Sequence, residues 1–517
     1  MAMVFLLVAC GPADGNGDAD KETDRIVPDA AVESDDTATD SLDEQVGFVT
    51  LEPRSIRIEG DVVYEGLTTQ TRLFYVFTPA TTAARRMPLL VVFNGGPSVA
   101  TSGNLAAFGM GKHWIDYYGD GGIHENPANF AEIGNLLFID TRHVGFSYGI
   151  LDTPESERAR SDAYNFINFG IYTAAADILL VVLDLLGRVP EIAHNPVVFV
   201  GESFGGARAA MIAALLMRPS ALMGDGPLVD PTLGAALRTH FNALSPGVPF
   251  DALTVNDTKR QFGWHVLLQP GYMLAPVDAY FHTTCLHLDA SDPRNPLCVE
   301  NPVELDLRHP GGVNGVLMAG HDAVLTPDGF ERLFGVPPQS VVGLAAKDRL
   351  GAFRYASITD STLFELWYSL MGTLASYDTY YLPRLDTGLD AVGFSVATTA
   401  TVPFMESLAH LHVFISNAFY DGIIAADRIP GGLMQASRDM ASPLIASARL
   451  ENEVREGATR PGWLDIEFTD AMGLGSDNKR TVRMPFYEDS GHMITLTQAG
   501  ALRDDIQQFL ASRGAYR

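Results

Sequence analysis

Three short runs of apolar residues, each bounded by Gly, Pro, Asn or Asp, stand out in the first half of the chain. They are Leu89–Phe93, Leu136–Ile139 and Val197–Val200. Continuous runs of this kind are typical of parallel strands that are buried on both faces of a sheet. Between the second and third runs, apolar residues recur at helical spacing over Asp162–Leu186. Strands that alternate with helices predict an α/β fold with a parallel sheet.

Weaker patterns extend this sheet in both directions. Val62–Pro79 predicts two strands, whose alternating polar residues indicate antiparallel pairing and one solvated face. The irregular composition between residues 219 and 405 predicts an insertion on the sheet, apart from one candidate strand within it. The other predicted elements are a helix over Ala207–Met217, strands over Trp264–Gln269, His410–Ser416 and Thr481–Phe486, and a closing helix over Gln498–Leu510.

The N-terminal segment differs in composition from the rest of the chain. Residues 11–46 hold twelve acidic and two basic residues and almost no large apolar ones, which predicts a disordered tether. Residues 1–10 are apolar and end in Leu7-Val8-Ala9-Cys10, which resembles a bacterial lipobox without the usual basic start. We expect a lipid anchor at Cys10 and a place in the bacterial cell envelope, or secretion. A disordered N-terminus with an incidental cysteine is the alternative.

Charge and cysteine content narrow the classes of partner. The 517 residues include 63 acidic and 35 basic ones, a formal net charge of −28. This charge repels phosphate backbones and anionic lipids, so we expect no nucleic-acid partner and no membrane contact beyond the lipid anchor. Cys285 and Cys298 are a candidate disulfide, with two separate thiols as the alternative. His410 and His412 share one predicted strand face, but without a third ligand they indicate no metal site, and we expect no cofactor.

The sharpest chemical signal is a G-x-S-x-G sequence at Gly201–Gly205, between a predicted strand and a predicted helix. This sequence is typical of a nucleophile elbow, a tight turn that exposes the serine, here Ser203, while glycines remove side chains that would collide. The N-terminus of the following helix favours the negative charge that develops during the reaction. A Gly-rich turn without catalytic function is the alternative.

A serine hydroxyl needs a base, and in this architecture the acid and then the histidine follow the serine along the chain. His492 is the predicted base, because it follows a predicted strand and precedes the last helix, whereas His321 precedes the acid. Asp421 follows another predicted strand and is the predicted acid that orients His492. Asp386 and Asp427 are the competing acids.

The turn after Leu89–Phe93 reads Asn94-Gly95-Gly96-Pro97 and supplies free backbone N–H groups. A tetrahedral oxyanion needs two such donors, one of them from the residue after the nucleophile. We therefore expect the N–H groups of Gly96 and Phe204 to form the oxyanion hole. A tight turn that holds no ligand is the alternative.

Four motifs in this order, NGGP, NLLFIDTRHVGFSYG, GESFGG and GHM, resemble the serine carboxypeptidase family of α/β-hydrolases. The resemblance implies a mostly parallel central sheet, helices on both faces and a large cap insertion after the elbow. It implies a peptide substrate and release of C-terminal amino acids through an acyl-enzyme, with a triad of Ser203, Asp421 and His492. It also implies that Asn94 and Glu202 hold the substrate's terminal carboxylate.

Some positions depart from the family's pattern. After NGGP the family continues Gly-x-Ser-Ser and later has a Glu that shares a proton with the elbow Glu. Here Ser98-Val99-Ala100-Thr101-Ser102 follows, and Leu105–Gly111 contains no acid. Val92 stands where the family usually has Trp, and Asn417-Ala418-Phe419-Tyr420-Asp421 replaces a Gly-Asp-x-Asp pattern. Because this second carboxyl is missing from the sequence, we expect Glu202 to be ionised at mildly acidic pH and to weaken exopeptidase activity there.

These observations predict five segments: a lipoprotein signal at residues 1–10, the tether at 11–46, an initial stretch of the hydrolase core at 47–218, a cap at 219–405 and the remainder of the core at 406–517. The leading function is a serine-type carboxypeptidase. The alternatives are an esterase or aminopeptidase-like hydrolase, which shares the triad, and a catalytically silent binding lipoprotein that keeps the fold.

Overall fold

The structure is a computed structural model. It describes residues 41–58, 63–95, 101–102, 109–115, 123–142, 147–150, 166–224, 226, 228–270, 284–286, 297–299, 401–418, 429–455, 457–488 and 490–516, all within the unit Ser41–Arg517. Within these residues, every helix is too short or too polar to cross a membrane.

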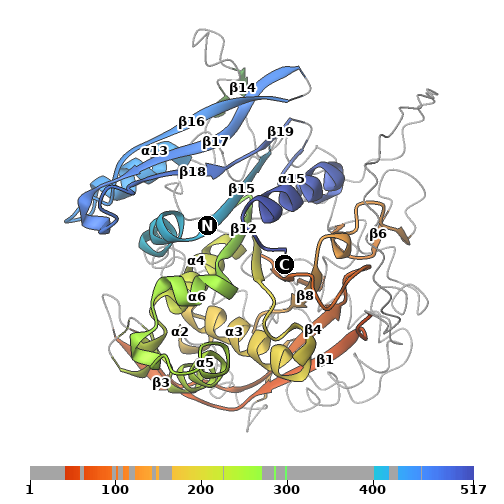
Figure 1. The fold of residues 1–517 in the computed structure, drawn as a ribbon, viewed down its shortest axis with the longest axis vertical. Helices are drawn as coiled ribbons and strands as arrows, with labels where there is room; N and C mark the ends of the chain where they lie inside the picture. Colours follow the sequence, from red (N-terminus) through yellow and green to blue (C-terminus); the bar gives the residue numbers. More distant parts are fainter. Residues whose placement is uncertain are drawn as a thin grey trace, which may run out of the picture. The chain divides into compact units, whose positions relative to one another are not determined.

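One large sheet organises the described residues (Figure 1). Its main path has the order β1-β4-β8-β5-β10-β12-β15-β18-β17-β16, and all neighbours from β8 to β18 are parallel. The outer pairs on both sides are antiparallel. The bounds are β1 Gln45–Leu51, β4 Gln70–Thr78, β5 Leu89–Phe93, β8 Asn135–Ile139, β10 Val197–Glu202, β12 Trp264–Leu268, β15 His412–Ala418, β16 Ile445–Arg455, β17 Ala458–Phe468 and β18 Lys479–Arg483.

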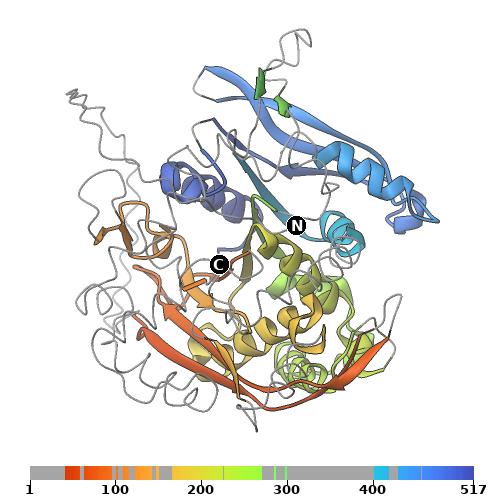
Figure 2. The ribbon, with the colours of Figure 1, turned by 180° about the vertical axis from the view of Figure 1, so that it is seen from behind.

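Besides the large sheet, the described residues form smaller sheets and several helices (Figure 2). β11 Leu228–Val229, β2 Ser55–Ile58 and β3 Tyr64–Leu67 form a three-stranded sheet; β6 His113–Ile115 pairs with β7 Ile123–Glu125, and β13 Thr284–Leu286 with β14 Leu297–Val299. β9 Tyr148–Ile150 pairs with β4, and β19 Phe486–Tyr487 with β15. The helices are α2 Phe166–Phe169, α3 Ile171–Arg188, α4 Phe204–Met217, α5 Pro231–Leu244, α6 Val255–Phe262, α13 Ile429–Arg438, α14 Ile494–Thr497 and α15 Ala499–Ser512, besides helical residues 401–410.

The two faces of the sheet pack into separate apolar cores, as alternation along a strand requires. From β10, Phe199 joins a core that includes residues of α3 and α4. Its neighbour Val198 joins a second core, to which α15 contributes Ile506 and Phe509. Both faces are therefore covered by helices, which explains why the central strands are apolar throughout.

The order in which strands are added to the sheet reverses between the parallel strands β5 and β10. From β5 the chain continues to β8 on one side, and from β10 it continues to β12 on the other. In open α/β sheets, ligands bind outside the carboxyl ends of the strands at such a switch point. Asn94 follows β5 and Ser203 follows β10, so two of the predicted site residues lie at this position.

Most predicted elements are confirmed, with shifted ends. The predicted strands within residues 89–93, 136–139, 197–200 and 264–269 are β5, β8, β10 and β12, and the predicted α/β arrangement with a parallel sheet is correct. Over its described residues, the helix expected at Asp162–Leu186 is divided into α2 and α3, which are separated at Gly170. The tether was predicted to reach residue 46, but β1 already begins at Gln45.

Three predictions about the sheet were wrong. The strands within Val62–Pro79 do pair antiparallel as predicted, β3 with β2 and β4 with β1 and β8, but β4 lacks the predicted solvated face, because its residues 73–78 are all buried. His410 ends a helix and β15 begins at His412, so these two histidines do not share a strand face. The strand expected over Thr481–Phe486 is interrupted before Pro485, which has no N–H to donate, and continues as β19.

The long hairpin of β16 and β17 was not predicted. In contrast, β12 was predicted and lies at the centre of the sheet, within the range assigned to the cap. Most of the remaining range, residues 271–400, lies outside the described residues apart from β13 and β14. The segment boundaries stay predictions.

Candidate active site

Ser203 has the backbone of a nucleophile elbow. Its φ is 53° and its ψ is −121°, between the end of β10 and the start of α4. Its N–H donates to the carbonyl of Leu268 at 2.8 Å, which fixes the turn to the neighbouring strand. A side chain on Gly201 would place its Cβ 2.3 Å from the carbonyl oxygen of Gly205, so this turn requires glycine. The predicted elbow is therefore present.

The turn after β5 packs directly against the elbow. A Cβ on Gly95 would lie 2.5 Å from the backbone N of Phe204 and 2.6 Å from Cβ of Ser203. On the other side of the contact, a Cβ on Gly205 would lie 2.5 Å from the carbonyl oxygen of Phe93. The N–H of Phe204, a predicted oxyanion donor, thus lies beside this turn, while Gly96, the other predicted donor, is outside the described residues.

Asn94 is held through its backbone. Its N–H donates to Oγ1 of Thr101 at 3.0 Å, and its carbonyl oxygen accepts a hydrogen bond from the guanidinium of Arg208 in α4. Ser102 follows Thr101 and binds Asp140 at the end of β8 through both its N–H, at 2.8 Å, and its hydroxyl, at 2.9 Å. These contacts anchor the turn after β5 to both neighbouring elements.

His492 is buried in the segment between β19 and α14, with 5% of its surface exposed. β19 runs parallel to the last residues of β15, so it carries the following loop past the carboxyl end of that strand. Within this loop the hydroxyls of Ser490 and Thr497 are 2.6 Å apart. The structure thus brings His492 to the expected edge of the sheet.

Of the remaining predicted site residues, the structure describes Glu202 but not the predicted acid, Asp421. Glu202 is the last residue of β10, is buried, and lies opposite Leu268 of β12 in the strand register. Its predicted role and the assignment of the triad stay predictions. Asp421, its competitors Asp386 and Asp427, His321 and the anchor residue Cys10 lie outside the described residues.

Two residues near the elbow were missed by the sequence prediction. Gln269 directly follows β12, is buried, and has a φ of 46°; its Oε1 accepts a hydrogen bond from the Ser416 hydroxyl at 2.9 Å. No sequence signal marks such a backbone. Arg208 did carry a signal, because it is the one charged residue in the otherwise apolar sequence of α4.

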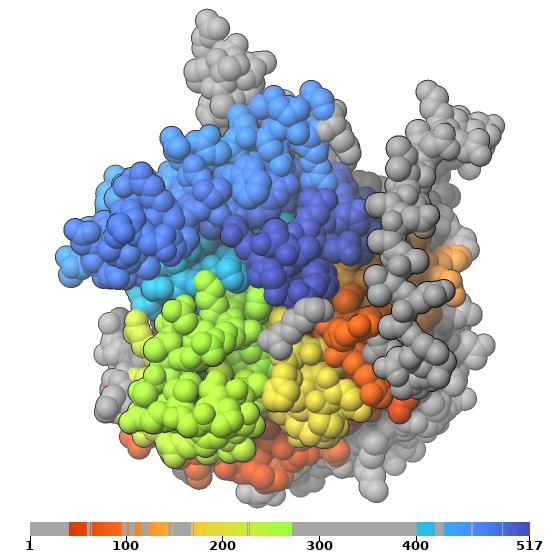
Figure 3. Space-filling view, viewed as in Figure 1, coloured from red at the N-terminus to blue at the C-terminus, as the bar shows by residue number. Residues whose placement is uncertain are grey.

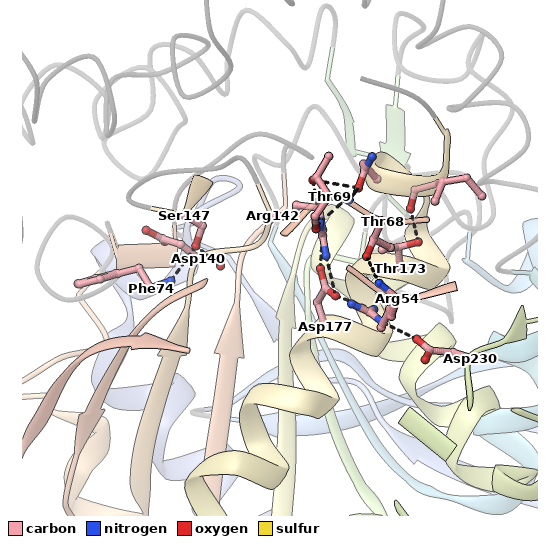
Figure 4. Close-up of polar contacts among 12 residues, drawn as sticks. Arg54, Thr68, Thr69, Phe74, Asp140, Arg142, Ser147, Thr173, Asp177 and Asp230 are labelled. Carbon is pink, nitrogen blue, oxygen red and sulfur yellow. Dashed lines mark hydrogen bonds and ion pairs between the residues drawn. The ribbon is translucent and has the colours of Figure 1, made fainter. Parts of the chain in front are cut away.

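A buried network of arginines and aspartates lies beside α3 (Figure 4). Arg54 donates to Asp177 and to Asp230, both at 2.7 Å, and Arg142 donates to Asp177 at 2.8 Å. Burial would raise the pKa of Asp177, but Arg142 and Arg54 outweigh it and hold the pKa below its usual value. Asp230 also caps the N-terminus of α5. The network joins α3, α5 and the residue before β2, and its chemistry is structural.

Histidines and cysteines also occur in described elements other than the elbow. Burial lowers the pKa of His265 to about 3 and that of His412 to about 4, so both are neutral at ordinary pH. In the described residues of the chain, no group of three or more His, Cys, Asp or Glu side chains is arranged to hold a metal ion. Cys285 and Cys298 lie directly opposite each other in the β13–β14 register, and their disulfide stays a prediction.

The match to a known protein family covers the segment with the elbow. The family model "Serine carboxypeptidase" matches residues 59–222. Serine carboxypeptidase-like 41 of Arabidopsis thaliana is 30% identical over 146 residues, 28% of each chain. Serine carboxypeptidase-like 44 of the same plant is 28% identical over 151 residues, 29% of each chain. The chain thus spans less than a third of the length of these curated relatives.

Among solved structures, a prohormone-processing carboxypeptidase of Saccharomyces cerevisiae aligns over 91% of both chains, with 11% identity and a TM-score of 0.44. A thermophilic esterase of Thermogutta terrifontis aligns over 90% of this chain and all of its own, with 11% identity and a TM-score of 0.33. The sheet order and the elbow make the fold that of an α/β-hydrolase. The predicted resemblance to the serine carboxypeptidase family is confirmed over residues 59–222, which hold both the Asn94–Gly95 turn and the Ser203 elbow.

Proposed function

We propose that this protein is a serine hydrolase of the carboxypeptidase type, which releases C-terminal amino acids from peptides. The observation that carries the proposal is the left-handed backbone of Ser203, packed against the Asn94–Gly95 turn. Ser203 is half-buried at the carboxyl edge of the sheet, and an elbow of this kind presents the serine hydroxyl to a substrate carbonyl. The family match of the same segment supports a peptide as the substrate.

In the proposed mechanism, Oγ of Ser203 attacks the carbonyl carbon of the last peptide bond while His492 takes the hydroxyl proton. Asp421 orients the imidazole and stabilises its positive charge. The N–H groups of Gly96 and Phe204 stabilise the oxyanion. His492 then protonates the leaving amine, so the C-terminal amino acid departs and an acyl-enzyme remains. Water, deprotonated by His492, hydrolyses this ester and restores Ser203.

Recognition of the substrate's free carboxylate would distinguish a carboxypeptidase from other hydrolases with the same triad. Asn94 and Glu202 are the proposed carboxylate-binding residues. Both are buried next to the nucleophile, one at the end of β5 and the other at the end of β10. Their backbone positions are fixed by strand pairing, because Phe93 and Gly201 are register partners.

The proposal is tested by release of the C-terminal amino acid from an N-acetylated dipeptide, with the C-terminal amide and a simple ester as comparison substrates. We expect release from the free acid, weaker cleavage of the amide, and loss of both in Ser203→Ala. Cleavage of the ester without release from the dipeptide would instead identify an esterase. If a serine-directed phosphonate fails to label the folded protein, the binding-protein alternative is favoured.

We further propose that Cys10 is lipidated and anchors the protein to the bacterial cell envelope. The support is the apolar sequence that ends in Leu7-Val8-Ala9-Cys10 and the acidic segment that follows it. Expression in a bacterial host with labelled fatty acid should give a labelled protein in the membrane fraction, and Cys10→Ser should be unlabelled. A wild-type protein without label would contradict this proposal.

A further inference from the structure

Arg208 is a buried charge in the helix that follows the nucleophile. It lies in the first half of α4, whose sequence FGGARAAMIAALLM has no other charged residue, and 4% of its surface is exposed. Transfer of a guanidinium from water into such a site is costly unless its hydrogen bonds are satisfied. A buried arginine so close to the nucleophile, as the fifth residue of α4, therefore indicates a specific requirement at this position.

Its contacts connect the two turns of the candidate site. The guanidinium donates through NH1 to the carbonyl oxygen of Asn94. Its Cζ also lies 5.2 Å from the ring centroid of Phe204, the residue that follows the nucleophile. Because Thr101 accepts from the N–H of Asn94, both backbone polar groups of Asn94 are held by residues outside β5. Arg208 thus fixes the orientation of Asn94 relative to the elbow.

The charge of Arg208 adds to this geometry. A guanidinium stays protonated in proteins, so a positive charge is present beside Asn94 at every working pH. Its electrostatic effect is strengthened by burial, because the surrounding dielectric constant is lower than in water. An ionised carboxylate near Asn94 is stabilised by this charge, whereas a neutral amide or ester gains little. An ionised Glu202, which the sequence predicts, would instead repel a carboxylate at this position.

We propose that Arg208 is a specificity-determining residue that positions Asn94 and favours substrates with a free C-terminal carboxylate over their amides. This inference rests on the proposed function, since it assigns the carboxylate subsite to the same turn. Arg208 acts through Asn94 and through its charge; it is a positioning residue and makes no bond to the reacting atoms. In this role it compensates for the acid that is absent from Leu105–Gly111.

The test measures binding without turnover, in a Ser203→Ala background. The probes are an N-acetylated dipeptide and its C-terminal amide, and the readout is the ratio of their two Kd values. Because Arg208→Met removes both the charge beside Asn94 and the hydrogen bond that orients Asn94, we expect binding of the free acid to weaken by at least about tenfold. Binding of the amide should change less than about twofold, and Arg208→Lys should partly restore the ratio.

Arg238 supplies the matched control. Its Cζ lies 5.2 Å from the ring centroid of Phe250, as in the Arg208–Phe204 pair, but it is an exposed residue of α5. Arg238→Met should leave the ratio unchanged. Thermal unfolding of each variant checks that it is folded, and Arg208→Lys provides the comparison if Arg208→Met does not fold.

The outcomes separate this inference from the proposed function. Equal weakening of both probes by Arg208→Met or Arg208→Lys, or no change in either, would overturn the inference, because the arginine would then belong to the scaffold only. An acid-over-amide preference that depends on Arg208 supports it, even if the protein with Ser203 releases no amino acid. In that case the carboxypeptidase proposal fails and the carboxylate subsite remains.

Discussion

Ser203 and Gln269 are non-glycine residues with positive φ, and they follow the neighbouring strands β10 and β12. Ser203 donates to Leu268, the residue just before Gln269, so the two unusual backbones are directly connected. Residues in such conformations store strain and are concentrated at functional sites. The strain at the carboxyl edge of the sheet therefore agrees with a site at that edge.

Gly95→Ala tests how closely the two turns must approach. The added Cβ would lie 2.5 Å from N of Phe204, so the turn and the elbow must move apart. A displacement of about 1 Å at a catalytic site lowers turnover by about 100-fold, which is the loss we expect. Gly187→Ala is the matched control. It lies in α3 with open space around its Cβ, so turnover should be unchanged and stability should rise by about 0.5–1 kcal/mol. Full activity of Gly95→Ala would contradict the proposed packing requirement.

His265 predicts a dependence of stability on acid. Burial lowers its pKa to about 3, while in the unfolded chain the usual value is near 6.5. Between these values the unfolded state binds the extra proton, so stability from this residue is complete above pH 6.5 and falls as the pH decreases toward 3. In His265→Leu, the slope of unfolding free energy against pH from 6 to 4 should be shallower by about 1.4 kcal/mol per pH unit. Denaturant titrations measure it.

Val266→Ala is the control for this measurement, because it shortens a buried, non-titrating side chain of the same strand and should keep the wild-type slope. The slope is the informative quantity, because replacing a core side chain also changes stability at every pH. An unchanged slope in His265→Leu would show that His265 does not resist protonation in the folded state.

At the residue level, the sequence was informative about local geometry and silent about contacts between distant segments. The glycines around Ser203 predict the elbow because the constraint lies within five residues. The hydrogen bond from Arg208 to Asn94 joins residues 114 positions apart, and no local pattern specifies it. Gln269 adopts its conformation because of its surroundings, which the sequence of that segment does not show.

Among the elements, too, the sequence predicted the strands whose local pattern is strong and missed a strand that depends on contacts with its neighbours. β5, β8 and β10 were predictable because burial on both faces requires continuous apolar runs. β16 was missed, since its sequence IASARLENEVR has mostly exposed or half-buried residues without a clear apolar face. It lies at the edge of the sheet, where it pairs with β17 and where Glu453 forms an ion pair with Arg483 of β18, at 2.6 Å, that connects it to the rest of the sheet.

The buried network predicts a large difference between two aspartates of the same helix. Asp177→Asn removes the carboxylate that two buried guanidinium groups share, and although Arg54 keeps Asp230, the change should lower the free energy of unfolding by about 3–5 kcal/mol. Asp184 also pairs with an arginine, Arg188, at 2.7 Å, but both side chains are more than a third exposed. Asp184→Asn should therefore cost less than about 1 kcal/mol. Urea denaturation compares them, and equal losses would contradict a structural role for the network.

The β13–β14 register makes the disulfide prediction specific. Directly opposed residues in antiparallel strands have Cα atoms about 4.5–5.5 Å apart, within the range that a disulfide spans. Alkylation of the denatured, unreduced Cys10→Ser variant should therefore detect no free thiol, and reduction should reveal two. Mass spectrometry gives the count. Two free thiols before reduction would show that Cys285 and Cys298 are separate.

At the scale of the whole molecule, the last strands and the last helix of the chain are connected to one another close to His492. α15 and the β16–β17 hairpin lie side by side in Figure 3, and Arg455 of β16 binds Asp505 of α15 at 2.7 Å. Asp505 also accepts a hydrogen bond from the hydroxyl of Tyr487 in β19, at 2.6 Å. The strand that precedes His492 is thereby fixed to the last helix.

Because His492 and its supporting helix are synthesised last, the order of synthesis determines when activity can appear. Ser203 and its turn leave the ribosome long before the proposed base, His492, and before the supporting helix α15, which ends at Ser512. Under the proposed mechanism, a partly synthesised chain holds a nucleophile without the group that activates it. Incomplete chains would then be inert toward peptides, and the appearance of activity would coincide with the completion of the fold.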